Sequence, residues 1–482
     1  MAGGKLAPAH CSEDTSSGVA PTLPTPSESP LGAKSAGETG GRLQETSQEP
    51  VSVAQGSALF FVSSIVRSTG FFVAALLLAR LLGPSGRGTM AFITVTALVV
   101  PRVAKLGLGQ ATSVLAAQRP SARPMLFSNL LTFSLGTSLV AGGIVAGVVH
   151  LSDAQPVGMS QTQVAIMVVG VVAASLVDDS FLIGSGRLRE AAAISASGGW
   201  LYVVALAAAL ATAGLTVESA ALAWVGAHLA WATLLAVVGL RTSGISLPSL
   251  RLLAESVRFG ARAWVGGVSQ LLNARLDQVL VGLIASEVVL GYYAVAVNCA
   301  EVLLFMPSAI ATSLLPAMAR EHGVTKVERT LRSFRSASVL TLGSIAAAAA
   351  VGWLLIPLVF GRDFSDSVQP FMWLLPGALG YTALSIFSSS LLASRAPGLS
   401  SLGSAAALGA GLAFDLALIP VFGAAGAAAA ASAAFLAGGL TVTVLYRRAT
   451  GFRWHEVVPT GDDVVFLRLV AARALRRGPE AA

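Results

Sequence analysis

Polar side chains lie in the middle of two apolar stretches that are long enough to cross a membrane. The stretches are Phe259–Ile284 and Val288–Met318, and the polar residues are Gln270, Asn273, Arg275 and Asp277 in the first and Asn298 and Glu301 in the second. An ionised group at bilayer depth costs at least about 2.5 kcal/mol, so it persists only beside a partner or a wet cavity. We therefore expect these stretches to line a polar space inside a membrane protein.

The composition supports this class. Of the 482 residues, 54% are hydrophobic and only 11% are charged, whereas soluble domains have about 25% charged residues. The 50 glycines suit helices that approach closely in lipid. The net charge of +7 does not indicate nucleic-acid binding, because the basic residues lie mostly in short loops between apolar segments. The sequence predicts an all-α polytopic membrane protein.

Twelve apolar segments divide the chain. They are Ser57–Leu82, Thr89–Leu106, Pro124–Val149, Gln163–Ile183, Ala191–Ala213, Ser219–Leu240, Phe259–Ile284, Val288–Met318, Ser336–Phe360, Val368–Ala393, Leu399–Val421 and Ala424–Tyr446. We expect a disordered tail over 1–56, a six-helix bundle over 57–240, a linker over 241–258, a second six-helix bundle over 259–447 and a basic tail over 448–482. Alternate linkers are rich in arginine and lysine, which by the positive-inside rule places both tails in the cytoplasm.

Arg67 is the notable residue of the first segment. It shares a helical stripe with Ser63, Ser64 and Ser68 and lies about ten residues from the inner end, too deep to reach the interface comfortably. It can form a structural ion pair or bind an anion in a cavity, and we favour the second interpretation.

The seventh segment presents charges on different faces. Gln270, Asn273 and Asp277 share one face, whereas Arg275 points about 200° away from Asp277 on a regular helix. Glu301 in the next segment is placed to neutralise Arg275 or Arg67. Arg275 is therefore equally compatible with a substrate contact and with a packed ion pair.

Other polar residues have weaker patterns. Asp178 and Asp179 fall close to Arg187 and Arg189, which favours an interfacial salt-bridge cluster; the isolated membrane residues are Asp415 and His228, and Tyr292 and Tyr293 fit an ordinary aromatic belt at the outer interface. No nucleotide-binding, metal-ligand or nucleophile motif is recognisable. We expect neither catalysis nor a cofactor.

The linkers after the first and seventh segments resemble each other. Gly88-Thr-Met-Ala aligns with Gly291-Tyr-Tyr-Ala, and Pro101 and Pro307 follow toward the inner ends of the next segments. This predicts two six-helix bundles in the same orientation, related by an axis along the membrane normal.

Short motifs in order along residues 57–447 resemble the Wzx-type polysaccharide flippases of the multidrug/oligosaccharidyl-lipid/polysaccharide (MOP) exporter superfamily. The motifs are Leu82-Gly-Pro-Ser-Gly-Arg-Gly88, Lys105-Leu-Gly-Leu-Gly109, Arg275-Leu-Asp277 with Gly291-Tyr-Tyr-Ala294 and Leu315-Pro316, Ile356-Pro-Leu-Val-Phe-Gly361 with Phe364, and Ile419-Pro-Val-Phe-Gly-Ala-Ala-Gly-Ala427. Asp415 departs from the family pattern, where an uncharged polar residue is expected.

The resemblance implies a MATE/MOP-like fold with twelve transmembrane helices around a central cavity in a bacterial plasma membrane. It implies alternating access and a substrate of undecaprenyl-pyrophosphate-linked oligosaccharide, moved from the inner to the outer leaflet, with membrane lipids and polysaccharide-assembly proteins as further partners. Carried onto this chain, headgroup binding falls on Arg67 and Arg275, with Gln270, Asn273 and Asn298 beside them, and coupling or charge balance on Asp277, Glu301 and Asp415. A cation-coupled multidrug exporter and a lipid II flippase are the alternatives.

Overall fold

The computed structural model describes residues 53–151, 159–319, 323–394 and 396–461. In these ranges the regular elements are helical. The α-helices are α1 (Val53–Ala104), α2 (Leu108–Gln118), α3 (Arg123–Leu151), α4 (Gln161–Leu176), α5 (Ser180–Gly184), α6 (Leu188–Ala213), α7 (Val217–Ser243), α8 (Leu250–Ile284), α9 (Glu287–Ala319), α10 (Gly323–Phe360), α11 (Val368–Leu374), α12 (Gly377–Ala393) and α13 (Pro397–Thr450). Short 3-10 turns are η1 (Pro120–Ala122), η3 (Arg362–Ser367) and η4 (Trp454–Val457). Residues 1–52 and 462–482 of the predicted tails lie outside the described residues.

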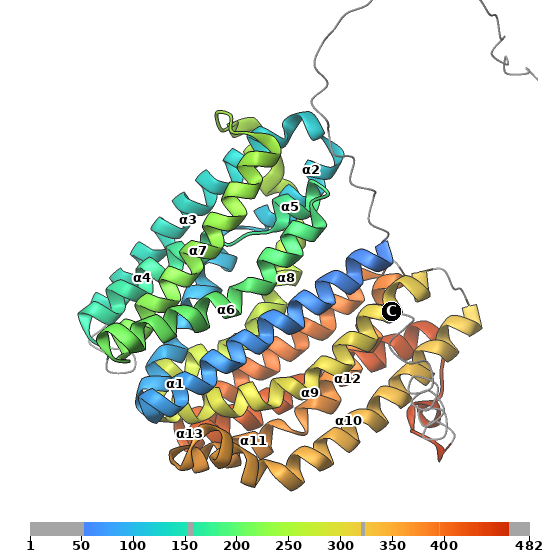
Figure 1. Cartoon of the computed structure of the whole chain (residues 1–482). Coiled ribbons are helices and arrows are strands. Elements are labelled where there is room, and N and C mark those ends of the chain that lie inside the picture. Colours follow the sequence, from blue (N-terminus) through green and yellow to red (C-terminus); the bar gives the residue numbers. More distant parts are fainter. Residues whose placement is uncertain (1–52, 152–158, 320–322, 395, 462–482) are drawn as a thin grey trace, which may run out of the picture. The chain divides into compact units, whose positions relative to one another are not determined.

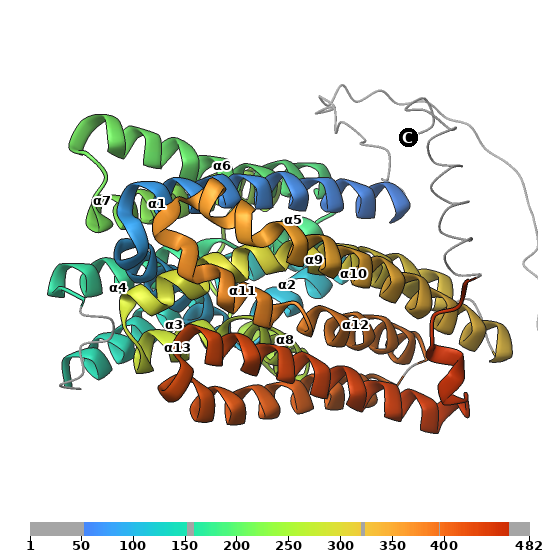
Figure 2. The same cartoon turned by 90° about the horizontal axis from the view of Figure 1, so that it is seen from below.

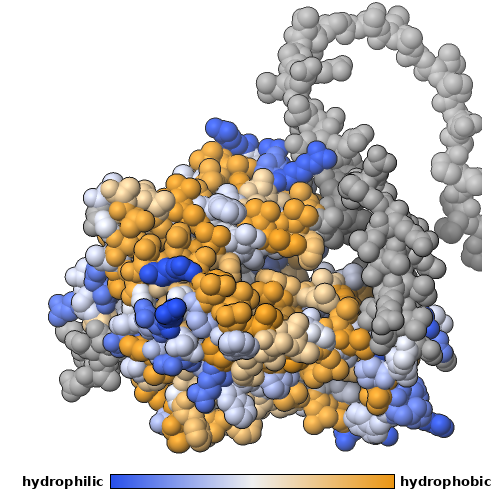
Figure 3. Space-filling view, turned by 60° about the horizontal axis from the view of Figure 1, so that its bottom comes forward, coloured by the Kyte–Doolittle hydropathy of each residue, from blue (hydrophilic) through white to orange (hydrophobic). Residues whose placement is uncertain are grey.

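The described helices have the length and surface of membrane spans. Eight are long and apolar enough to cross a bilayer, or nine if the bent pair Arg362–Leu374 and Gly377–Ala393 forms one span. Large apolar side chains point outward, and Val140, Val204 and Val421 are each 65–70% exposed. In Figure 3, hydrophobic residues cover most of the coloured part of the visible face. Such a surface suits lipid rather than water, so the prediction of an all-helical membrane protein is confirmed.

Two of these helices contain a sharp bend at a glycine. α1 bends at Gly83, where φ is +68°, and α13 bends at Gly423, where φ is +55°. A side chain is strained in this left-handed region, so glycine permits the turn, and Pro84 and Pro420 lie beside the two bends. The bends fall where the first predicted segment gives way to the second, and the eleventh to the twelfth.

The helices form two sets of contacts that share α1. In the first set α3, α4, α6 and α7 pack against one another, and in the second α9 and α11 pack with α12 and α13 while α10 packs on α12. α1 contacts both α6 and α9, as Figures 1 and 2 show. α8 contacts α2 and α1 as well as α13. It therefore connects the two sets.

A reciprocal backbone contact joins α1 to α9. A methyl group at Gly88 would overlap the carbonyl oxygen of Glu287, and a methyl group at Gly291 would overlap the carbonyl oxygen of Pro84. Pro84 precedes Gly88 by the same four residues that separate Glu287 from Gly291. The two stretches that align in the sequence, around Gly88 and Gly291, thus pack directly against each other.

The first half of α8 packs on the N-terminal set of helices. Gly260 lies against the backbone of Gly107, and the Trp264 indole donates a hydrogen bond of 3.0 Å to the carbonyl of Val103. Arg119 donates two hydrogen bonds, of 3.0 and 2.6 Å, to Glu255. Residues 250–258, within the predicted linker, are the first turns of this helix.

We predict that Gly88→Ala and Gly291→Ala each destabilise the protein. Each added methyl group meets a backbone oxygen that cannot rotate away, and overpacking of this kind costs about 1–3 kcal/mol. The measurement is thermal unfolding in detergent. Gly226→Ala in α7 is the matched control, because its methyl group would meet open space and alanine is favoured over glycine in a helix by about 0.5–1 kcal/mol. Equal unfolding temperatures for all three variants would contradict the tight crossing.

We predict that the Arg119–Glu255 contact weakens in acid. The hydrogen bonds from Arg119 hold the pKa of Glu255 below its ordinary value of 4.5. The contact therefore contributes fully above that pH and is lost as the pH falls through the lower pKa of the folded state. The unfolding temperature of wild type should fall more steeply below about pH 4.5 than that of Glu255→Gln. Unfolding temperatures that fall in parallel with pH for the two proteins would show that the contact adds no stability.

Candidate functional site

A cluster of charged side chains lies where α1, α4, α5 and α8 meet. Lys105, which follows α1, places its Nζ 3.0 Å from Oδ2 of Asp178, which lies in the turn between α4 and α5. The charge of Arg102 interacts with Asp178, Asp179 and Arg275. Arg67 interacts with Asp179 and Arg102. We call this the central charge cluster, and it comprises Arg67, Arg102, Lys105, Asp178, Asp179 and Arg275.

The bend of α1 explains why Arg67 and Arg102 come together. Arg67 precedes Gly83 by 16 residues and Arg102 follows it by 19. At about 1.5 Å per residue, both lie roughly 24–28 Å from the bend along antiparallel arms of the helix. They consequently reach a similar depth. Arg67 also donates a hydrogen bond to the Ser195 hydroxyl of α6, and it has no ion pair within hydrogen-bonding distance among the described residues.

Arg275 is paired with Glu301 across α8 and α9. Its Nη1 lies 2.6 Å from Oε1 of Glu301, and the two side chains are 29% and 36% exposed. Of the two partners that the sequence offered Glu301, the structure selects Arg275. Because both side chains are partly accessible, the pair is not sealed in a core.

A second polar group, which we call the acid cluster, also lies where α8 packs on α9. The Tyr293 hydroxyl donates to Oδ2 of Asp277, and the backbone N–H of Gln278 donates to Oδ1 at 2.7 Å. Asp415 of α13 is only 3% exposed, and its charge interacts with both Asp277 and Tyr293. Oδ1 of Asp415 has no hydrogen-bond partner in the described part of the chain. The acid cluster comprises Asp277, Tyr293 and Asp415.

The three predicted amide residues have different surroundings. Asn273 donates a hydrogen bond of 2.9 Å to the carbonyl of Ser404 on α13. Gln270 is exposed. The amide nitrogen of Asn298 is buried without a partner in the described residues, one helical turn before Glu301. Of the three, Asn298 is the one with an unused buried donor.

Two sequence-based assignments are corrected by the geometry. Asp178 pairs with Lys105, whereas Arg187 pairs with Glu190 at 2.9 Å, because the chain leaves the helix after Leu176 and turns Asp178 toward α1. Tyr293 is fully buried against Asp277 and does not belong to an interfacial belt. A tyrosine sixteen residues after an aspartate gives no periodic pattern in the sequence, so only the packing of α8 on α9 reveals the pair.

Arg102 and Lys105 were missed as site residues because they fell at the inner end of a short predicted segment.

His228, which had no evident partner, places its ring against Trp224 and Trp231, and its Nδ1 lies 2.9 Å from the carbonyl of Trp224. Among the described residues, no group of three or more His, Cys, Asp or Glu side chains is arranged to hold a metal ion.

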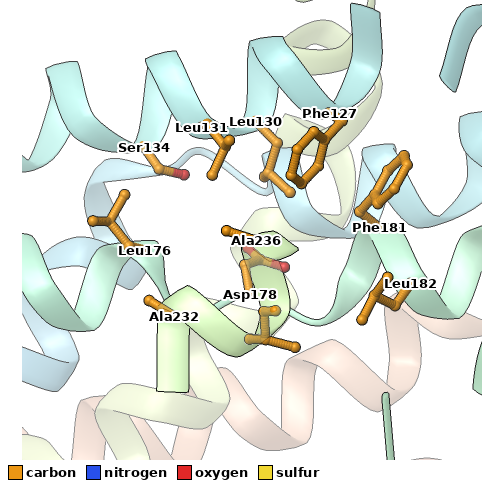
Figure 4. Close-up of a pocket in the computed structure, with 11 residues that line it drawn as sticks. Phe127, Leu130, Leu131, Ser134, Leu176, Asp178, Phe181, Leu182, Ala232 and Ala236 are labelled. Atoms are coloured by element: carbon orange, nitrogen blue, oxygen red, sulfur yellow. The ribbon is translucent and has the colours of Figure 1, made fainter. Parts of the chain in front are cut away.

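Figure 4 shows a small hollow beside Asp178. Its walls are mostly apolar and come from α3, α5 and α7 and the end of α4, with Ser134 and Asp178 as the polar members. The cavity volume is about 10 Å³, close to the least that holds one water molecule. The Ser134 hydroxyl has no partner among the described residues, which suits a water there. The hollow is far too small for a sugar or a lipid headgroup.

Similarity to solved structures establishes the fold. An inward closed conformation of the lipid II flippase MurJ matches with a TM-score of 0.68 and 13% identity, over 81% of this chain and 87% of that one. An inward-facing multidrug resistance MATE transporter of the MOP superfamily matches with a TM-score of 0.61 and 17% identity, over 80% and 98% of the two chains. An outward-facing MATE structure gives 0.50 and 15% identity, over 82% and 94%. The chain has the MATE/MurJ-like fold.

Sequence comparison establishes the family. No curated protein sequence matches this chain. The profile of a family described as polysaccharide biosynthesis protein matches residues 77–369, which is more than half of the chain. Family and fold together confirm the sequence-based recognition of a polysaccharide biosynthesis protein with a MATE/MurJ-like fold. This chain belongs to the polysaccharide biosynthesis protein family.

Proposed function

We propose that this protein is a flippase for undecaprenyl-pyrophosphate-linked oligosaccharide. The observation that carries the proposal is that Arg102, in the central charge cluster, lies within electrostatic range of both Arg67 and Arg275. In a polysaccharide biosynthesis protein, the expected cargo joins a neutral or acidic glycan to a pyrophosphate and a lipid tail. Arginines bind phosphate oxygens with paired, charge-assisted hydrogen bonds.

The proposed architecture has twelve spans. Eight helices qualify by length and composition, and α1 and α13 each hold two spans because they turn at Gly83 and Gly423. The bent pair of η3/α11 and α12 supplies another span, and α8, which is less apolar, supplies the last. The reciprocal contacts of Gly88 and Gly291 support two six-helix bundles, 57–240 and 259–447, related by an axis along the membrane normal.

The distribution of basic residues supports cytoplasmic termini in a bacterial plasma membrane. In that orientation the Gly88–Glu287 crossing lies near the outer face, and the central charge cluster lies on its cytoplasmic side. A headgroup from the inner leaflet would reach the arginines without passing the crossing. Rocking of the bundles would then expose it to the outer leaflet.

We call Arg67, Arg102 and Arg275 the clamp, and in the proposed mechanism it exchanges one bound anion for another. The carboxylate of Glu301 holds Arg275 while the site is empty, and the pyrophosphate replaces that partner when substrate enters. Arg67 and Arg102 add positive charge, which offsets the cost of taking the headgroup from water. Asn298, Gln270 and Asn273 lie on the same two helices and supply hydrogen bonds to the sugar. The lipid tail remains in the bilayer.

The acid cluster is the proposed site of energy coupling. Asp277 and Asp415 are close enough to interact, and one oxygen of Asp415 is unused. Two carboxylates at this depth favour uptake of a proton or a cation. Glu301 links this site to the clamp, because Asp277, Arg275 and Glu301 interact. Alternatively, consumption of the product outside drives transport.

The acid cluster also favours the second candidate, a cation-coupled multidrug exporter. Such a transporter would bind cationic cargo at Asp277 and Asp415, and the arginines would then hinder it. A lipid II flippase would share the pyrophosphate clamp but carry a different glycan. The lipid II flippase and the proposed flippase are distinguished by which substrate the protein transports.

The test is transport of a fluorescent undecaprenyl-pyrophosphate oligosaccharide by the purified protein in liposomes. Wild type should translocate it, and Arg67→Ala, Arg102→Ala and Arg275→Ala should each reduce the rate about tenfold or more, since loss of one charge-assisted contact costs about 1.5–3 kcal/mol. Arg258→Gln is the matched control, because this arginine is exposed at the start of α8 and should transport normally.

A double-mutant cycle that measures binding of inorganic pyrophosphate to the purified protein tests the exchange mechanism. Glu301→Gln should tighten binding of inorganic pyrophosphate to wild-type Arg275 and have no effect in Arg275→Ala. Wild-type protein that moves no lipid-linked sugar but exchanges cationic dyes for protons would replace the flippase with the drug exporter. Transport of lipid II in preference to the oligosaccharide would identify the other alternative.

A further inference from the structure

Arg87 is a buried arginine without a counter-charge. It follows the bend of α1 and is 7% exposed. Its Nε is fully covered and has no hydrogen-bond partner, and no carboxylate among the described residues forms an ion pair with the guanidinium. The proposed flippase mechanism does not use this residue. It lies apart from the central charge cluster, since neither Arg67 nor Arg102 interacts with it.

The surroundings of Arg87 make this arrangement costly. Its neighbours along α1 are Gly88, Thr89 and Met90, all buried, and Met90 belongs to an apolar core with Met167 and Trp224. An arginine always carries its charge, so it cannot escape the desolvation cost by losing a proton. A charge in such a place is normally paired.

Tyr202 of α6 faces the same charge. It is 3% exposed, and its hydroxyl likewise has no hydrogen-bond partner in the described part of the chain. The guanidinium and the hydroxyl are within electrostatic range but do not hydrogen-bond to each other. Tyr202 belongs to the same buried cluster as Met90, three residues after Arg87, so two buried donors without partners lie close to one positive charge.

Nearby carboxylates of the adjoining elements are used elsewhere. Glu218 at the start of α7 accepts a hydrogen bond of 2.7 Å from Gln163 of α4. Glu287 at the start of α9 accepts from Ser85 at 3.4 Å. Neither interacts with Arg87. A water molecule would satisfy the two donors but would leave the charge uncompensated.

We infer that Arg87 and Tyr202 bind a small inorganic anion of the size and charge of chloride. The Nε–H of Arg87 and the O–H of Tyr202 both donate to it, and its charge balances the guanidinium. Arg87 lies directly between the bend at Gly83 and the tight crossing at Gly88. The anion therefore stabilises the segment of α1 that packs on α9.

The experiment measures thermal unfolding of the full chain in detergent at constant ionic strength, with chloride replaced stepwise by gluconate, a much larger anion. The unfolding temperature of wild type should rise with chloride and saturate, because a ligand of the folded state stabilises it by mass action. Tyr202→Phe keeps the ring and removes one donor. It should raise the half-saturating chloride concentration about tenfold, the equivalent of one hydrogen bond.

Arg87→Met keeps the bulk of the side chain without the charge, so it should fold and lose the chloride dependence entirely. Arg362→Gln is the matched control, since this arginine is exposed, and it should respond to chloride as wild type does. In crystals grown with bromide, anomalous density is expected between Arg87 and Tyr202. An unfolding temperature of wild type that is independent of chloride, or a dependence that persists in Arg87→Met, would overturn the inference.

Discussion

The cost of an uncompensated charge in a low-dielectric layer governs the arrangement of this protein. Each intramembrane charge that the structure compensates within the chain ties two elements together. Lys105 and Asp178 join the end of α1 to the turn after α4, and Arg275 and Glu301 join α8 to α9. The first pair lies at a break in the helices, because a regular helix beyond Leu176 would aim Asp178 elsewhere.

α1 packs closely on its neighbours both at its bend and beside the central charge cluster, where Gly199 of α6 lies against the carbonyl of Arg67. At the bend, Gly88 and Gly291 allow α1 and α9 to meet without side chains between them. Away from the bend, Arg67 lies on the part of α1 before Gly83 and Arg102 on the part after it, and the charge of Arg67 interacts with Asp179. The central charge cluster therefore lies at the end of the two arms that is remote from the bend, and glycines permit close approach at both ends.

Sequence periodicity predicted the helices well because spans need about 20 apolar residues and this requirement is local. It also placed Arg67, Arg275, Asp277 and Glu301 in the membrane, where an ionised side chain is conspicuous. It failed for Arg102, whose depth depends on the bend at Gly83, and for Tyr293, whose partner lies on another helix. Partners across helices depend on the angle at which the helices pack, and one sequence contains no measure of that angle.

α8 carries two charged side chains that have different partners. Arg275 projects toward Glu301 and the charge of Arg102, whereas Asp277, about 200° around the helix, projects toward Tyr293 and the charge of Asp415. A tilt or rotation of α8 changes both environments at once. A ligand shifts such an equilibrium only by its difference in affinity for the two positions. Under the proposed function, an anion at Arg275 and a proton or cation at Asp277 act on the same two packed helices, α8 and α9, through which binding of one alters the affinity for the other.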